Sequence, residues 1–443
     1  MAYNKYYLQK KQVSYDNGLT WEDVTPTETR QGTYIDTYQT LAECEAIDYS
    51  TQYLTFESLE DDNQIFFKLG QNNTAKTISA STDNGVTWTE YTSTSGNSGT
   101  TIATLNTGDK VLVKGTNAAY GNGNYGSTNY YNRFLGSKRF NAYGNATSLI
   151  YGDDFETSGD TIGDYAFQGI FYDSDNLISA KNLVLPSTTC GQESYANMFQ
   201  HSNSLVEAPS AINAANGVST CSEMFRGCNN LTSPPALPAT TLGNGCYFYM
   251  FAGCTSLTTA PDLPATTLAS NCYQHMFRGC SNLTTAPSVL PATTLAYACY
   301  NEMFYECTSL TSAPVLPATT LANSCYNLMF YNCRSLTVAP ELPATTLKTQ
   351  CYQSMFYGCS SLTTAPVLSA TTLANYCYNQ MFYNCTSLNY IKCLATDISA
   401  SMCTYYWLNG VAATGTFVKD ASMTGWSTGV SGIPDGWTVQ NNS

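Results

Sequence analysis

One arrangement of apolar residues recurs along the C-terminal part of the chain. A Met-Phe pair returns every 26 residues, with one step of 27 where Ser288 and Val289 add a residue. Degenerate copies at Ile170-Phe171 and Trp407-Leu408 extend the array to about ten rungs. Self-similarity at such a period is typical of a solenoid, in which each repeat packs on its neighbours. The phenylalanines of the pair are Phe199, Phe225, Phe251, Phe277, Phe304, Phe330, Phe356 and Phe382.

Within each repeat, the pattern predicts a helix followed by an extended segment. Leu268, Cys272 and Met276 are four apart, a spacing that Cys280 continues, which places them on one face of a helix. The preceding Thr-Thr pair suits an N-cap, and Gly or Asn before the second cysteine suits a helix end. The segment that follows is short, so we expect a strand. Proline removes a hydrogen-bond donor from the strand ladder once per rung, so a long, smooth β-helix is disfavoured. These interruptions are expected at Pro261, Pro287, Pro314, Pro340 and Pro366.

Apolar and polar positions alternate over the first 115 residues, which is typical of strands. Residues 3–25 contain two such runs around Asp16-Asn17-Gly18. Residues 53–115 contain LTFES, QIFFKL, TISAS, VTWTEY, TIATL and KVLVKG. We expect a hairpin module and then a β-sandwich of six or seven strands.

These patterns divide the chain into five parts. We expect an N-terminal β-hairpin attachment module at 1–48 and a β-sandwich domain at 49–115. A segment rich in Gly, Asn and Tyr, 116–164, is interpreted as a linker and N-terminal cap. The solenoid then covers 165–410. A C-terminal cap with Trp426 and Trp437 closes it at 411–443.

Charge and hydropathy narrow the range of partners. The formal net charge is -14, and 22 of the 32 carboxylates lie in the first 175 residues, so the repeats are nearly uncharged. Nucleic acid is therefore not an expected partner. No run of 18 apolar residues occurs, and the opening MAYNKYYLQKKQ has no apolar signal core. We expect neither membrane insertion nor Sec-type export.

Most of the 18 cysteines fall in two columns of the repeat, and three interpretations compete. Cysteines eight apart on a helix would lie about 12 Å apart, too far for a disulfide, whereas bridges between neighbouring rungs stay open. Zinc sites use closely paired ligands, often with His, and the chain has two histidines. Cys190 stands in a leucine column, and Ser202 and Val411 stand in the second cysteine column. We therefore interpret the cysteines as buried core residues, which fits folding in a reducing cytoplasm. No metal or cofactor is expected.

The repeat M-F-x-x-C-x-S-L-T-x-A-P-x-L-P-A-T-T-L resembles the BspA-type leucine-rich repeats over roughly residues 165–410. The sequence departs from the family pattern in two ways. The usual isoleucine of the strand is replaced by Ala260, Ala286 and Ala313, and the family pattern lacks the first cysteine column. The opening YYLQKKQVSYDNGLTWEDVTP is similar to N-termini of virion proteins of phages, including crAss-like phages, that infect gut Bacteroidales. The resemblance implies an α+β leucine-rich-repeat solenoid, with a short strand plus a helix in each rung. It also implies adhesion or receptor recognition rather than catalysis.

Two motifs raise and then weaken the idea of an enzyme. Residues 14–21 and 81–88 match the S-x-D-x-G-x-T-W Asp-box, which is a hairpin clasp on sialidase propellers, and two boxes cannot build a propeller. Glu302 and Glu306 lie four apart, with Arg278 and Arg334 in adjoining rungs, as in a glycosidase carboxylate pair. A solvated helix face is the simpler interpretation, and no catalytic triad or phosphate-binding loop accompanies the pair. We expect no enzyme.

A column of four tyrosines is the candidate binding site. Stacked one rung apart, these side chains would form a stripe that offers flat apolar faces with hydroxyl tips to sugar rings or to a protein partner. A second tyrosine column, from Tyr247 to Tyr378, is nearly invariant and is assigned to packing. The repetitive Thr-Thr pairs also suggest an ice-binding ladder, but we assign them to helix caps. The candidate stripe consists of Tyr305, Tyr331, Tyr357 and Tyr383.

The function predicted from these features is that of a phage virion fibre or adhesin. The N-terminal β modules would attach to other virion proteins, and the solenoid would bind a polysaccharide or protein of the bacterial surface. Such a protein is made in the host cytoplasm and ends up in the virion. A secreted bacterial adhesin lacking its signal peptide and a polysaccharide-degrading tailspike are the alternatives. A homotrimer is possible, but no heptad pattern sets a stoichiometry.

Overall fold

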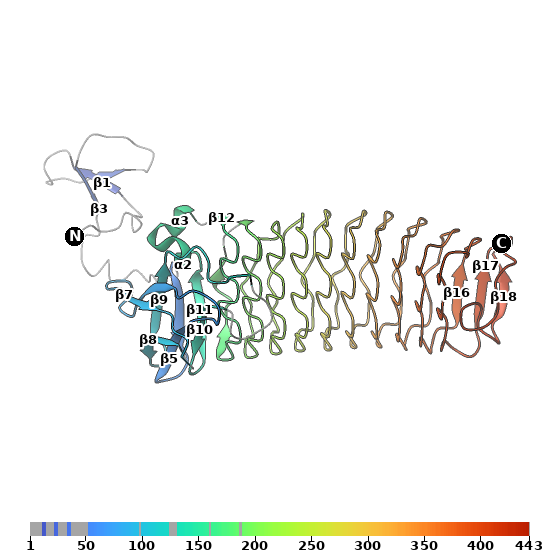
Figure 1. The fold of residues 1–443 in the computed structure, drawn as a ribbon, viewed down its shortest axis with the longest axis horizontal. Coiled ribbons are helices and arrows are strands. Elements are labelled where there is room, and N and C mark those ends of the chain that lie inside the picture. The colour runs from blue at the N-terminus through green and yellow to red at the C-terminus, as the bar shows by residue number, and fades with distance from the viewer. Residues whose placement is uncertain are drawn as a thin grey trace.

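The computed structural model describes residues 11–14, 22–24, 33–36, 52–96, 99–123, 131–158, 161–185 and 188–442. A strand-rich N-terminal region precedes a solenoid of about 11 turns (Figure 1). The solenoid predicted from the repeat is confirmed. Strands β1 (Lys11–Ser14), β2 (Glu22–Val24) and β3 (Thr33–Asp36) form an antiparallel sheet in the order β2-β1-β3. The turn at Asp16-Asn17-Gly18, with most of the first Asp-box, lies outside the described residues.

The six alternating runs of residues 53–115 each form a strand. They are β4 (Leu54–Ser58), β5 (Asn63–Lys68), β6 (Thr77–Ser81), β7 (Thr89–Thr92), β8 (Thr100–Leu105) and β9 (Lys110–Gly115). Segment 116–164 adds β10 (Arg133–Gly136) and β11 (Phe140–Asn145) to the sheets instead of acting only as a linker and cap. Sheet β10-β5-β8 packs on the larger sheet β13-β11-β4-β9-β6-β7, where the rings of Phe134 and Phe56 lie 5.0 Å apart.

The second Asp-box closes the loop between β6 and β7. The Asp83 carboxylate accepts hydrogen bonds from the Ser81 hydroxyl and from the backbone amide and hydroxyl of Thr87. Trp88 Nε1 donates to the Gly85 carbonyl at 3.0 Å. The interpretation of residues 81–88 as a structural clasp is therefore confirmed.

The larger sheet leads directly into the solenoid. Short helices α2 (Ser148–Tyr151), η3 (Gly152–Asp154) and α3 (Phe155–Ser158) follow β11, and then β12 (Thr161–Ile162) pairs with β15 (Thr189–Cys190). Strands β13 (Leu177–Ser179) and β14 (Leu183–Val184) both run parallel to β11. One cluster of buried residues extends from Leu54 to Trp437, so the sheets and the solenoid share a single core.

A run of turns stands where the sequence predicted a helix in each rung. Through residues 247–253 the backbone N–H groups alternate between two partners. Tyr247 N donates to Cys272 O of the next rung at 3.0 Å, whereas Phe248 N donates to Gly245 O of its own rung at 3.1 Å. An α-helix would instead bond each N–H four residues back. The predicted helix is therefore wrong, and the described residues 188–442 contain none.

Every fourth residue of these turns has a left-handed backbone. In one rung the φ angles of Gly245, Tyr249 and Gly253 are 59°, 53° and 76°. The period of four in the sequence comes from this turn geometry, so it imitated a helical face. The Gly and Asn residues interpreted as helix ends are members of the same series. At non-glycine positions such a conformation costs roughly 1–2 kcal/mol, which bonds to neighbouring rungs must offset.

The proline-rich side of each rung is held by single bridges. Thr259 pairs with Thr285, and Thr241 with Thr267, in parallel orientation. In the described part of residues 191–389, no strand extends beyond such single bridges, which confirms the expected interruption. Among all described residues, no helix has the length and apolar character that a membrane crossing requires.

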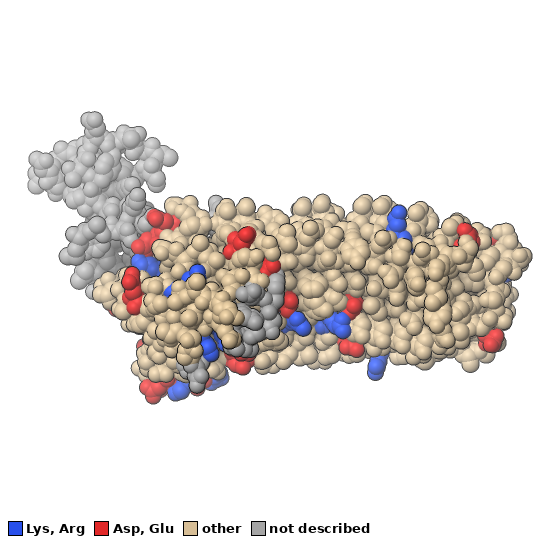
Figure 2. Space-filling view, in the orientation of Figure 1, with Lys and Arg blue, Asp and Glu red and all other residues tan. Residues whose placement is uncertain are grey.

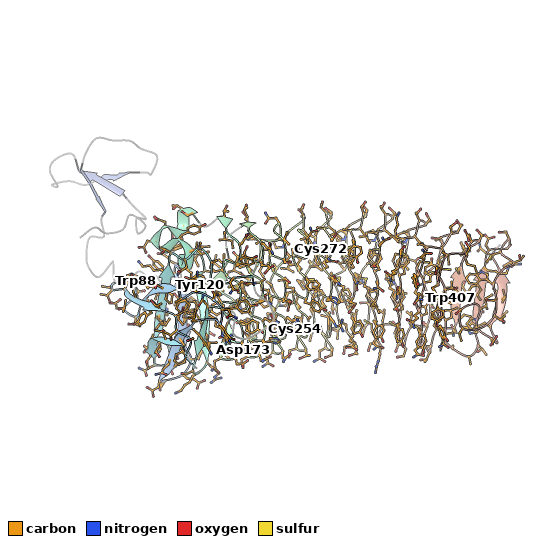
Figure 3. All side chains as sticks on the ribbon, in the orientation of Figure 1. Trp88, Tyr120, Asp173, Cys254, Cys272 and Trp407 are labelled. Carbon is orange, nitrogen blue, oxygen red and sulfur yellow. The ribbon has the colours of Figure 1, made fainter. Side chains whose placement is uncertain are left out.

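Strands and tryptophans close the C-terminal end. Strands β16 (Tyr390–Cys393), β17 (Thr416–Lys419) and β18 (Thr438–Asn441) form a parallel sheet in that order. Trp407, labelled in Figure 3, stacks on Trp426 at 5.4 Å and donates from Nε1 to the Gly432 carbonyl. These contacts cover the last rung of the core.

The phenylalanines of the Met-Phe pairs stack along one axis. From Phe171 to Phe382 the ring centroids of neighbours are 5.2–5.6 Å apart, and their planes differ by 2–9°. The 27-residue step between Phe277 and Phe304 leaves the ladder undisturbed, at 5.5 Å and 6°. The rungs therefore superpose on this column, as the sequence predicted.

All cysteines in the described part of the chain are buried and free, which confirms core packing. Figure 3 labels one member of each column, Cys254 and Cys272. The second column has a further role, because Cys254 Sγ donates to the Phe225 carbonyl of the preceding rung at 3.1 Å. The same bond recurs down to Cys385, and Ser202 makes it with its hydroxyl at 2.7 Å. This column therefore supplies a hydrogen-bond donor between rungs, which explains the serine.

Replacement of Cys280 tests the donor. Cys280→Ser keeps a group that can reach the Phe251 carbonyl, whereas Cys280→Ala removes the bond and leaves a small cavity. We expect the alanine variant to lose about 1–2 kcal/mol of unfolding free energy and the serine variant clearly less. Urea-unfolding midpoints of the two variants provide the comparison. A serine variant no more stable than the alanine variant would show that the donor is unimportant.

The buried thiols should resist labelling. Burial raises the pKa of the Cys280 thiol to about 12, so the reactive thiolate is scarce at neutral pH. In a Cys44→Ser variant, we expect native protein to incorporate almost no iodoacetamide and denatured protein to react at all remaining cysteines. Intact-mass spectrometry counts the adducts. Rapid labelling of Cys254 or Cys280 in folded protein would contradict the burial.

Candidate binding surface

The four tyrosines of the predicted stripe lie side by side on the solenoid. Each follows the phenylalanine of its rung and points away from the core, and each is half-buried. Neighbouring ring centroids are 4.5–4.6 Å apart, with planes within 1–14° of parallel. The structure thus brings Tyr305, Tyr331, Tyr357 and Tyr383 together in one column.

Stacking changes what this stripe can present. Because the rings lie face to face, each covers the face of the next, and the flat faces expected from the sequence are not open to a ligand. Ring edges and phenol hydroxyls remain. Burial, followed by the neighbouring phenol of Tyr305, raises the pKa of Tyr331, so this phenol stays protonated and can donate at neutral pH.

A charged cluster covers the N-terminal end of the stripe. The Arg278 guanidinium lies 4.2 Å from the centroid of the Tyr305 ring and forms an ion pair with Glu302. Glu302 also lies 3.1 Å from Nδ1 of His275, whose ring stacks on Tyr249 at 4.1 Å. Arginine over an aromatic face is a favourable cation–π contact. The cluster fixes the first ring of the stripe in place.

The carboxylates of Glu302 and Glu306 do not lie on the helix face that the sequence predicted. Glu302 and Glu306 lie in a run of turns, both with positive φ, and not on a solvated helix face. Glu302 is engaged by Arg278 and His275, whereas Glu306 is exposed. Among the described residues, no group of three His, Cys, Asp or Glu side chains could hold a metal ion.

Charge is distributed unevenly along the molecule. Acidic and basic side chains gather on the N-terminal sheets and the first turns, and the visible face of the later turns carries few (Figure 2). The later turns are those that carry the stripe. Between Tyr305 and Tyr383 the chain has few charged residues, so this surface presents mainly aromatic edges and hydroxyl groups.

The inner tyrosine column is a packing element, as predicted. Its rings are almost fully buried and lie 5.6–6.2 Å from their neighbours. The ladder continues from Tyr378 to Trp407 at 6.1 Å. The two tyrosine columns therefore have opposite roles, one in the core and one at the surface.

The sequence placed Arg278 in a rung adjoining Glu302, but it did not indicate that the two side chains form a pair or that His275 joins them. From the sequence, Glu302 was considered for catalysis only together with Glu306. Arg278 and Glu302 are 24 residues apart, which is close to one rung, so alignment of neighbouring rungs could have suggested the pair. The contact needed the turn geometry, because only that shows which positions of adjacent rungs face each other.

Comparison with known proteins identifies the repeat. The family model for the BspA type leucine rich repeat region, built of six copies, matches residues 134–284, 196–337 and 297–406. Together these matches cover more than half of the chain. The chain belongs to the BspA-type leucine-rich-repeat family. Solenoids of this kind are typically binding or scaffold folds, because they offer long surfaces built from repeated units.

One solved structure and the curated proteins complete the comparison. The chain is similar to a leucine-rich repeat protein from Bacteroides ovatus ATCC 8483, with 16% sequence identity and a TM-score of 0.25. The match covers 64% of this chain and 87% of that chain. No curated protein matches the chain significantly.

The buried tyrosines predict a loss of stability at high pH. Burial raises the pKa of Tyr326 well above its ordinary value. The stability linked to the neutral phenol is thus present below about pH 10, the unfolded value, and is lost as the pH rises toward the folded value. We expect the urea midpoint to fall above about pH 10, less steeply in Tyr326→Phe. Tyr297→Phe, at an exposed position, is the control and should leave the slope unchanged.

Proposed function

We propose that this BspA-type repeat protein is the receptor-binding fibre of a phage, and that its tyrosine stripe contacts a polysaccharide or protein of the bacterial surface. The observation that carries the proposal is the row of Tyr305, Tyr331, Tyr357 and Tyr383, stacked at 4.5–4.6 Å in a stretch of the chain with few charged residues. Tyrosine is enriched in binding surfaces because it offers large contact area and a hydroxyl at a low cost in conformational entropy.

The geometry favours a long, repetitive ligand. The edges and hydroxyls of the stripe repeat at a nearly constant interval over four rungs, so an extended chain could make the same contact several times. Contacts of this kind are individually weak. Many fibre copies on one particle would convert them into strong attachment through effective concentration.

The placement on a virion rests on the opening of the chain, which is similar to N-termini of phage virion proteins. In this proposal the N-terminal region binds other virion proteins and the solenoid projects outward. Mass spectrometry of purified virions tests the placement. Recovery of the chain only from the surface fraction of uninfected bacteria would overturn it in favour of a bacterial adhesin.

Substitution of the stripe tests recognition. A variant with Ala at all four stripe positions should adsorb to Bacteroidales cells at least about tenfold more weakly, because several contact residues are lost together. A second variant with Phe at these positions keeps the stack and removes only the hydroxyls, so it separates their contribution. Binding of fluorescent protein to cells is the measurement.

Matched controls keep that test specific. Thr293, Thr319, Thr345 and Thr371 are exposed and repeat with the rungs in another column, so their joint replacement by Ala alters a different repeating surface. Circular dichroism and thermal melting confirm that each variant is folded. Unchanged adsorption by the folded four-alanine variant would remove the stripe as the binding site.

A further inference from the structure

A concave surface lies where the N-terminal sheet meets the first turns of the solenoid. It is a groove of about 650 Å³, lined on one side by β4, β9 and β11 and on the other by residues near β13 and β14 and by residues 210–213. Pockets that enclose small ligands typically measure about 300–1,000 Å³. The groove is formed from paired strands that share one core, so its two sides are held together.

The strand side of the groove is a row of polar residues. In the sheet register Asn141 pairs with Glu57, and Glu57 pairs with Lys110, so the three side chains stand next to one another across three strands. Their neighbours Phe56, Val111 and Phe140 face the core. Tyr143, two residues after Asn141, lies on the same face, with Lys110 Nζ 5.8 Å from its ring centroid.

The solenoid side carries balanced charge and amide groups. Lys181 Nζ lies 3.2 Å from Glu207, which also accepts a hydrogen bond from Ser179. The hydrogen bonds from Ser179 and Lys181 lower the pKa of Glu207, so this carboxylate stays ionised and the pair is neutral overall. Asn182 and Asn213 are exposed and contribute amides that both donate and accept.

These features match the chemistry of sugars. We propose that the groove binds a short, neutral oligosaccharide, at a site separate from the tyrosine stripe. Sugar hydroxyls both donate and accept, as do the amides of Asn141, Asn182 and Asn213, and an aromatic ring beside them provides an apolar contact for a sugar ring. The balanced charges give no preference for an anionic ligand.

The test measures binding of defined trisaccharides to the full chain. Maltotriose, cellotriose and laminaritriose are titrated up to about 10 mM by saturation-transfer NMR, with trigalacturonate as a charged comparator. At least one neutral sugar should bind, and more tightly than trigalacturonate. Failure of all three neutral sugars, or tighter binding of trigalacturonate, would overturn the proposal.

Variants locate the bound sugar. The double variant Asn182→Ala and Asn213→Ala should weaken binding by about tenfold, because two hydrogen-bonding groups are lost at exposed positions. Asn323→Ala, an exposed asparagine on a later turn, is the matched control and should bind normally. The variant with Phe at the four stripe positions should also bind normally. Binding that is lost in the stripe variant but kept in the groove variant would overturn the groove site without affecting the proposed stripe.

Discussion

Hydrogen bonding from one rung to the next is the constraint on which the solenoid depends. Every second amide of the turn run donates to the following rung, and the amides between them close turns within their own rung. An isolated rung would leave half of these donors unpaired and would still bear the strain of its left-handed residues. The rungs are therefore stable only as a stack, and both ends need covers. The N-terminal sheets and the C-terminal tryptophans provide them.

Because the sequence repeats, much of this fold could be predicted from it. The period, the phenylalanine ladder, the buried cysteines and the interrupted ladder at the prolines all follow from residues that recur in register. The helix was wrong because a spacing of four fits both a helical face and a run of turns with positive φ at every fourth residue. The positive φ occurs at residues such as Tyr249 and Leu328, whose residue types do not indicate a left-handed backbone. Strands β10 and β11 were missed because the Gly, Asn and Tyr around them imitate a linker.

The candidate site was predictable in its members but not in its geometry. The column from Tyr305 to Tyr383 could be found by aligning the rungs. That the rings cover one another's faces depends on the distance between rungs and on the orientation of the side chains, which no single repeat encodes. The contacts of Arg278 with Tyr305 and Glu302 likewise exist only between rungs. The groove between the N-terminal sheet and the first turns combines residues far apart in the chain, so the sequence alone could not reveal it.

The extra residue at Ser288 and Val289 shows how tolerant the array is of change in length. It is absorbed on the proline-rich side, while the aromatic stack beside it keeps its spacing. Neighbouring repeats also share most of their residues, so recombination between them could add or delete whole units. Each event would alter the reach of the molecule by about 4.8 Å, the distance between adjacent strands, and leave the remaining units intact. The same gene could thus evolve longer or shorter versions of its product without inventing a new fold.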